Sequence, residues 1–198
     1  MNLNLQKMTT TERIKTAFDQ YIELPLEGWK SFTDMGEIVL IEKDVIIKQC
    51  NTIENYLYFI LSGSGAILIW NKQNAVCIDL CFENDFFGDY MSFLTHSVSP
   101  LEVVTFEQTE LFRISKTNFD KLSTTQLGDK ICRFAAEGLF IHKQQQQIDI
   151  LTKTAKERYI ELQQQHASIL LRTPQKYIAS YLGVTPQSLS RIRAELAK

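Results

Sequence analysis

Near the C-terminal end of the chain, polar side chains suited to nucleic-acid contact follow one another at helical spacing. Gln187, Ser188, Ser190, Arg191 and Arg193 share the polar face of a segment whose other face is apolar. Arginine and glutamine can each form paired hydrogen bonds with a base edge, and hydroxyl groups reach phosphate oxygens. These residues therefore predict a surface that reads duplex DNA, with the polar outer face of a helical bundle as the alternative.

Two short helices must hold this surface, and the sequence TPQKYIASYLGVTPQSLSRIRAELAK over 173–198 marks both of them. Thr173-Pro174 and Thr185-Pro186 each place a capping hydroxyl before a proline at the first helical position. Gly183 tolerates the left-handed backbone that ends the first helix. The apolar stripes of the two helices are Ile178, Ala179 and Leu182, then Leu189, Ile192 and Leu196. This pattern predicts a helix-turn-helix.

The stretch TPQKYIASYLGVTPQSLSRIR resembles the C-terminal helix-turn-helix of the CRP/FNR superfamily of bacterial transcription regulators, in the branch common in Bacteroidetes. The resemblance implies a homodimer on a roughly palindromic DNA site, with RNA polymerase as a further candidate partner. By position, Pro186, Gln187 and Arg191 occupy the base-reading slots, with Arg191 expected on guanine and Gln187 on adenine or another base edge. The expected phosphate contacts are Thr173, Gln175, Lys176, Thr185, Ser188, Ser190 and Arg193.

Charge is divided unevenly along the chain, and the division supports a DNA-binding C-terminus. Residues 1–151 carry 13 Lys+Arg and 20 Asp+Glu, so 13 − 20 = −7, whereas residues 152–198 carry 8 and 3, so 8 − 3 = +5. A basic surplus in the segment with the helix-turn-helix is what phosphate contact requires.

Other function classes find little support in the 198 residues. We find no paired carboxylates, nucleophile–base pair or phosphate-cradling glycine loop, so the chain is predicted not to be an enzyme. No cysteine precedes Cys50, which argues against the iron–sulfur cluster of the oxygen-sensing relatives, and no metal site is predicted. The absence of a long apolar run and of a signal-peptide core predicts a cytoplasmic protein that makes no contact with membranes.

The middle of the chain reads as short strands separated by polar or glycine turns, which predicts a sandwich, barrel or jelly roll. The expected strands are 38–41, 45–48, 56–61, 66–70, 76–82, 103–106 and 111–114. The segment YLYFILSG over 56–63 and the triplet Phe87-Gly88-Asp89 resemble the cyclic-nucleotide-binding β-roll. We therefore expect an α+β fold, with an effector β-roll over 1–125, a dimerisation helix over 126–151 and a winged-helix-like helix-turn-helix domain over 152–198.

The expected effector pocket departs from the family pattern at its anion site. The resemblance places Phe87, Gly88, Asp89, Tyr90 and Ser99 in the pocket, and the family's phosphate-binding arginine would fall near Ser99 or Pro100. No Arg or Lys occurs between Lys72 and Arg113. A cyclic phosphate would enter without a cation, so we predict that cAMP binding is lost and that no cofactor is held. The alternatives are a pocket for another small metabolite, or a regulator still gated by a cyclic nucleotide.

The helix over 126–151 carries a repeat suited to a two-stranded dimer. Apolar or small residues recur at spacings of three and four; the predicted dimer seam is Leu127, Ile131, Phe134, Gly138, Ile141 and Ile148. The same stripe could instead pack on its own β-roll, and one stripe could do both. After it, Thr154 and Glu157 form a capping box that opens the next helix. A wing would have to come from about 168–172, or be nearly absent.

Overall fold

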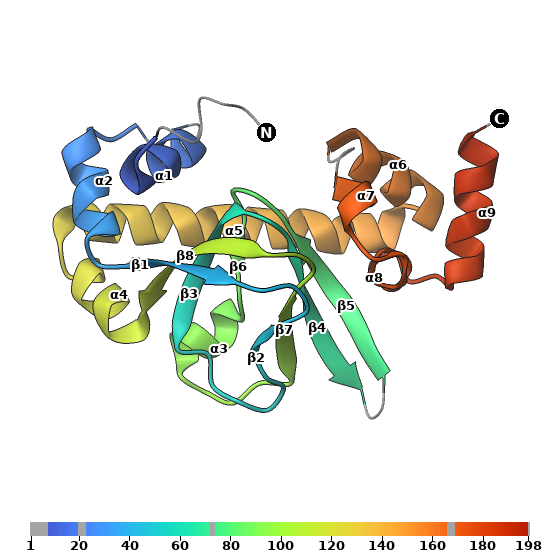
Figure 1. Ribbon diagram of the computed structural model, residues 1–198, viewed down its shortest axis with the longest axis horizontal. Helices are drawn as coiled ribbons and strands as arrows, with labels where there is room; N and C mark the ends of the chain where they lie inside the picture. Colours follow the sequence, from blue (N-terminus) through green and yellow to red (C-terminus); the bar gives the residue numbers. More distant parts are fainter. Residues whose placement is uncertain (1–7, 20–22, 72–73, 166–168, 198) are drawn as a thin grey trace.

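The computed structural model describes residues 8–19, 23–71, 74–165 and 169–197, and Figure 1 shows their arrangement. The helices are α1 (Thr10–Phe18), α2 (Leu26–Thr33), α3 (Tyr90–Thr95), α4 (Lys116–Ser123), α5 (Gln126–Thr152), α6 (Ala155–Gln165), α7 (Ile169–Arg172), α8 (Gln175–Tyr181) and α9 (Pro186–Leu196). The strands are β1 (Glu37–Ile41), β2 (Ile46–Lys48), β3 (Tyr56–Ser62), β4 (Gly65–Asn71), β5 (Asn74–Cys81), β6 (Phe86–Phe87), β7 (Leu101–Thr105) and β8 (Thr109–Ser115).

The β-roll consists of two four-stranded antiparallel sheets, with strand orders β1-β8-β3-β6 and β2-β7-β4-β5. Each of the seven expected strands is present, as is the long helix expected from residue 126. The structure adds β6, which pairs with Tyr58 and Phe59 of β3. Its two residues are too few to show the alternation by which a strand is recognised in sequence.

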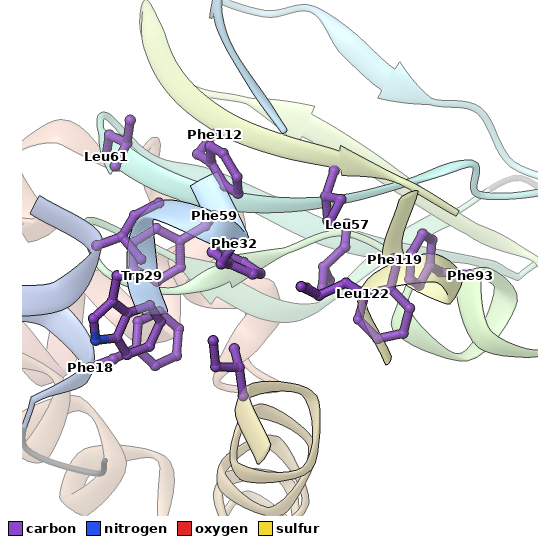
Figure 2. Close-up of a cluster of buried hydrophobic side chains, with 13 residues drawn as sticks. Phe18, Trp29, Phe32, Leu57, Phe59, Leu61, Phe93, Phe112, Phe119 and Leu122 are labelled. Atoms are coloured by element: carbon purple, nitrogen blue, oxygen red, sulfur yellow. The ribbon is translucent and has the colours of Figure 1, made fainter. Parts of the chain in front are cut away.

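One hydrophobic core fixes the N-terminal helices and the beginning of α5 against the first sheet. Figure 2 shows its aromatic residues. The ring of Phe18 lies 5.2 Å from that of Trp29 and 5.3 Å from that of Phe59, between centroids. Phe112 of β8 and Ile131 of α5 belong to the same cluster. Tilted aromatic pairs at this distance add to the stabilisation from burial. This core therefore holds the beginning of α5 against the first sheet.

A second core joins the β-roll to the C-terminal helices. Its residues are Ala66, Leu68, Cys77, Leu80, Phe82, Val104 and Phe106 of the roll, with Tyr159, Leu162, Ile178, Ala179, Leu182 and Leu189 of the C-terminal helices. The rings of Phe106 and Tyr177 stack with centroids 4.7 Å apart. The helix-turn-helix therefore shares one buried surface with the outer face of the second sheet.

Helices alone form the C-terminal segment as far as the structure describes it. The expected capping box is present, because the Thr154 N–H donates to Glu157 and the Glu157 N–H donates to the Thr154 hydroxyl. Where a wing was expected, residues 169–172 form α7, and residue 168 lies outside the described ranges. Of the two expectations for the wing, the described residues fit the one in which it is nearly absent. None of the described helices combines the length and the apolar character that crossing a membrane requires.

Candidate nucleic-acid interface and effector pocket

The corner between α8 and α9 follows the expected local chemistry at all but one position. Gly183 has φ of 71°, and the Thr185 hydroxyl accepts from the Ser188 N–H at 3.1 Å. Pro186 is the first residue of α9. The beginning of α8 corrects the prediction, because Pro174 and not Thr173 is its N-cap. The Pro174 carbonyl accepts from Tyr177 at 2.9 Å, so α8 begins one residue later than expected.

α9 lies at one end of the molecule (Figure 1). Leu189 is almost fully buried in the second core, and Ile192 packs against it. Gln187, Arg191 and Arg193 are exposed on the other side. The apolar stripe thus holds the helix in place while the predicted base-reading side chains remain free to enter a groove.

The basic residues that the structure describes in the C-terminal segment fall into two groups. One group stabilises the fold: Lys153 pairs with Glu161, Lys156 with Glu195 and Arg172 with Glu83, and Arg158 donates to the Tyr181 carbonyl. The other group consists of Lys176, Arg191 and Arg193, none of which forms an ion pair with any described residue. These three cations are among the predicted DNA contacts.

The remaining predicted phosphate contacts differ in accessibility. Gln175, Thr185 and Ser190 are exposed, and Ser188 is half-buried. The predicted role of Thr173 is corrected by its position, because this residue is only 4% exposed and lies beneath the surface. A side chain buried to this degree cannot reach a phosphate.

In the effector pocket, Asp89 is already bound on both carboxylate oxygens. Oδ1 accepts from the Ser92 N–H at 3.0 Å and so caps α3. Oδ2 accepts from the Ser99 hydroxyl and lies 3.1 Å from the ammonium of Lys48. Lys48 and Asp89 are 4% and 1% exposed. The predicted effector pocket therefore contains a cation, Lys48, whose charge neutralises that of Asp89.

Lys48 was missed by the sequence analysis because it lies on β2, outside the stretch where the family's arginine would fall. Its ammonium also donates to the Ser99 hydroxyl at 3.0 Å and to the Leu101 carbonyl at 2.7 Å. The ammonium thus forms two hydrogen bonds and one ion pair within the protein. A phosphate that approached Lys48 would have to compete with these partners.

The other expected pocket residues contribute mainly to packing. Phe87 is fully buried in the core of the roll, and the ring of Tyr90 stacks on that of Phe93 at 6.5 Å. Gly88 has φ of 145°, and a Cβ on it would lie 3.4 Å from the Oε2 atom of Glu54. The structure thus brings Gly88, Asp89 and Ser99 together and places the two aromatic rings outside the polar group.

Glu54 is a second buried group that sequence analysis missed. Its Oε1 atom accepts from the N–H groups of Asn55 and Tyr56 at 3.0 and 3.2 Å. Its Oε2 atom is buried without a hydrogen-bond partner among the described residues. Burial raises the pKa of Glu54 to about 7, against the lowering effect of the backbone N–H groups and Lys48. When the Glu54 carboxyl is ionised, it adds a second negative charge near Asp89 and so opposes the entry of a phosphate.

The predicted dimer seam of α5 separates into two parts. Leu127, Ile131 and Phe134 pack against the core of their own roll, and Ile131 is only 3% exposed. Ile131 is therefore corrected from a seam residue to a core residue. Ile141, by contrast, is 67% exposed, and Ile148 and Gly138 are also exposed. The half of α5 nearer to the helix-turn-helix thus leaves its apolar residues uncovered.

Comparison with known proteins agrees with this architecture. Residues 38–126 match the family model of the cyclic nucleotide-binding domain. No curated protein sequence matches the chain. The c-di-GMP responsive global regulator CLP of Xanthomonas campestris superposes with a TM-score of 0.67 at 14% identity, over 87% of this chain and 92% of that chain. FixK2 of Bradyrhizobium japonicum superposes with a TM-score of 0.67 at 19% identity, over 82% of this chain and 84% of that chain. A CooA mutant from Carboxydothermus hydrogenoformans superposes with a TM-score of 0.65 at 16% identity, over 98% of this chain and 87% of that chain. Residues 38–126 are thus similar to a cyclic nucleotide-binding domain, and the chain as a whole shares the fold of CLP, FixK2 and CooA.

Proposed function

We propose that this protein is a transcription regulator that binds a roughly two-fold symmetric DNA site as a homodimer. The observation that carries the proposal is α9, whose back is buried while Gln187, Arg191 and Arg193 face outward. Arg191 and Arg193 form no ion pair with a described residue, so their charges are available to DNA. Arginine is the residue best suited to bidentate contact with guanine in the major groove.

The proposed homodimer forms along the exposed half of α5. Gly138, Ile141 and Ile148 follow one another at spacings of three and seven residues, which keeps them on one side of the helix. Two parallel α5 helices that meet there would place both α9 helices at the same end of the dimer. Each could then enter one of two successive major grooves, about 34 Å apart.

We further propose that the β-roll does not bind cyclic nucleotides. The support is the network of Lys48, Asp89 and Ser99, in which the cation already forms one ion pair and two hydrogen bonds. A cyclic phosphate would have to break these bonds and would meet Glu54 nearby. The roll then acts as a scaffold, or as a receptor for a ligand without phosphate.

DNA binding is tested with a site selected by the wild-type protein from a random duplex library. Arg191→Ala should weaken binding to that site by about 1–3 kcal/mol while changing binding to random duplex much less. Lys43→Ala removes an exposed cation of the roll and serves as the matched control, which should leave both affinities unchanged. Equal loss on selected and random DNA would assign Arg191 to phosphate contact. Absence of any selected site would overturn the proposed function.

The effector pocket is tested by calorimetric titration of the dimer with cAMP, with cGMP in parallel. Since CLP is described as c-di-GMP responsive, c-di-GMP is included as a third ligand. We expect no heat of binding up to millimolar concentration. Micromolar binding of any of the three would contradict the closed pocket and would favour the alternative of a nucleotide-gated regulator.

A further inference from the structure

The edge of the second sheet is completed by the C-terminal helices. β5 is the outermost strand, so its outward N–H and carbonyl groups have no neighbouring strand. The Cys77 N–H instead donates to the Ser180 hydroxyl of α8 at 2.9 Å, and the Ile78 carbonyl accepts from Gln146 of α5 at 3.1 Å. Figure 1 shows α8 on the outer side of β5. An uncovered edge is a site for unwanted strand pairing, so these contacts also protect the sheet.

A second attachment joins α7 to the turns between β5 and β6 and between β7 and β8. Arg172 donates to both oxygens of Glu83 at 2.9 and 2.8 Å, and lies 3.2 Å from Glu107. Glu83 in turn accepts from the Gly63 N–H at 3.0 Å, and Glu107 from the Ser64 hydroxyl at 2.6 Å. Burial alone would raise the pKa of Glu83, but the bonds from Arg172 and Gly63 outweigh it and leave this pKa below its ordinary value. Hydrogen bonds from Gly63 and Ser64 therefore help to hold both carboxylates in the orientation that Arg172 contacts.

A third attachment lies where α5, β5 and α8 meet. Asp79 of β5 accepts from Lys143 and from Gln146, both on α5. The Gln146 amide also reaches the Tyr181 hydroxyl of α8 at 3.4 Å. These three groups of contacts surround the apolar surface that the roll and the helix-turn-helix share, so they oppose both sliding and rotation of one against the other.

We propose that Arg172 and Ser180 are positioning residues that fix the helix-turn-helix on its own β-roll and so determine the half-site spacing that the dimer accepts. The inference rests on the proposed function. Only Lys153 and Thr154 lie between α5 and α6, and Lys153 pairs across this link with Asp149 of α5 and Glu161 of α6, which restrains α6 but does not reach α8 or α9. The attachments to β5 and to the β5–β6 and β7–β8 turns restrain the helix-turn-helix at a distance from this link. With both recognition helices held in advance, the dimer loses less conformational freedom when it binds DNA.

The proposal predicts a change in spacing selectivity and not merely in affinity. The wild-type dimer should prefer one spacing strongly. In the Arg172→Gln/Ser180→Ala variant, binding at that spacing should weaken roughly ten-fold, and the difference between spacings should become smaller. Binding to an isolated half-site should stay the same, because neither residue lies on the exposed face of α9.

The test uses the selected site and versions in which the half-sites are moved apart by about one and two base pairs, each turning a half-site by roughly 35°. Fluorescence anisotropy gives the affinity of the wild type and of the double variant for each duplex. Lys176→Gln is the matched control: it removes an exposed cation of α8 and should weaken binding equally at every spacing. Retention of the wild-type spacing profile by the double variant would overturn the inference. Failure of the wild type to bind any selected DNA would instead overturn the proposed function.

Ser180→Ala alone keeps the inference testable if the double variant does not fold. It removes one hydroxyl without leaving a buried charge. The Cys77 amide should then exchange its hydrogen faster than in wild type, and the loss of spacing selectivity should be smaller than in the double variant. Unchanged exchange at Cys77 with unchanged selectivity would count against a positioning role for Ser180.

Discussion

Replacement of Lys48 by methionine tests the account of the closed pocket most directly. The substitution keeps an unbranched chain of similar length but removes the ammonium from beside Asp89. The carboxylate then remains buried at 1% exposure, with the Ser92 N–H and the Ser99 hydroxyl as its donors. Removal of one member of a buried ion pair costs about 3–5 kcal/mol, because the charge left behind has lost its partner. The Leu101 carbonyl loses its bond from Lys48 as well.

Urea denaturation followed by circular dichroism measures this loss in the free energy of unfolding, and thermal denaturation gives the matching change in melting temperature. For a chain of this size, about 3–5 kcal/mol corresponds to a decrease in melting temperature of roughly 6–20 °C. The double variant Lys48→Met/Asp89→Asn should recover much of the lost stability, since asparagine can still cap α3 and carries no charge. A loss below about 1 kcal/mol for Lys48→Met, or no recovery in the double variant, would refute the claim that Lys48 neutralises Asp89.

Two further results are expected. Ile141→Asp should convert the proposed dimer to a folded monomer in analytical ultracentrifugation, because this side chain is 67% exposed in the single chain. Leu171→Asp, at a position on α7 that is 85% exposed, is the control, and an unchanged dimer in Ile141→Asp would contradict the seam. Burial, together with the nearby charges of Asp79 and Glu83, raises the pKa of Asp85 to about 7, against the lowering effect of the Phe82 N–H. The folded protein therefore retains a proton that the unfolded chain releases near pH 4, so this stabilisation is complete below pH 4 and is lost as the pH rises through 7. Urea denaturation gives the free energy of unfolding of Asp85→Asn and of wild type, and the difference between them should favour the variant more at pH 8 than at pH 5. An equal difference at the two pH values would contradict the raised pKa.

The fold was largely predictable because its signals are local. Strands of alternating or continuous apolar character, a capping box at Thr154 and the Gly183 turn each depend on residues a few positions apart. The α8–α9 corner followed for the same reason, apart from the capping position. Thr173 was misjudged because its burial depends on tertiary packing, which its immediate sequence does not indicate.

The pocket was harder to predict because its chemistry is assembled from distant strands. The missing arginine was visible as an absence between Lys72 and Arg113. The compensating Lys48 was not visible, since a lysine at the end of a short strand is usually exposed. Glu54 was missed for a similar reason, because its burial follows from the packing of α3 over the beginning of β3. The correction to Ile131 has the same origin: a heptad pattern gives the face of a helix but not which surface covers it.

The second core has a consequence for how the chain is made and how its parts can be exchanged. During synthesis, Leu80, Phe82 and Phe106 leave the ribosome long before Ile178 and Leu189, which cover them in the finished protein. The nascent roll therefore carries an uncovered apolar surface until the last helices arrive. A fragment cut after α5 would keep that surface exposed, and such surfaces promote association. A foreign helix-turn-helix grafted onto this roll would need a matching apolar face on its first helix, so the two regions are exchangeable only as a pair.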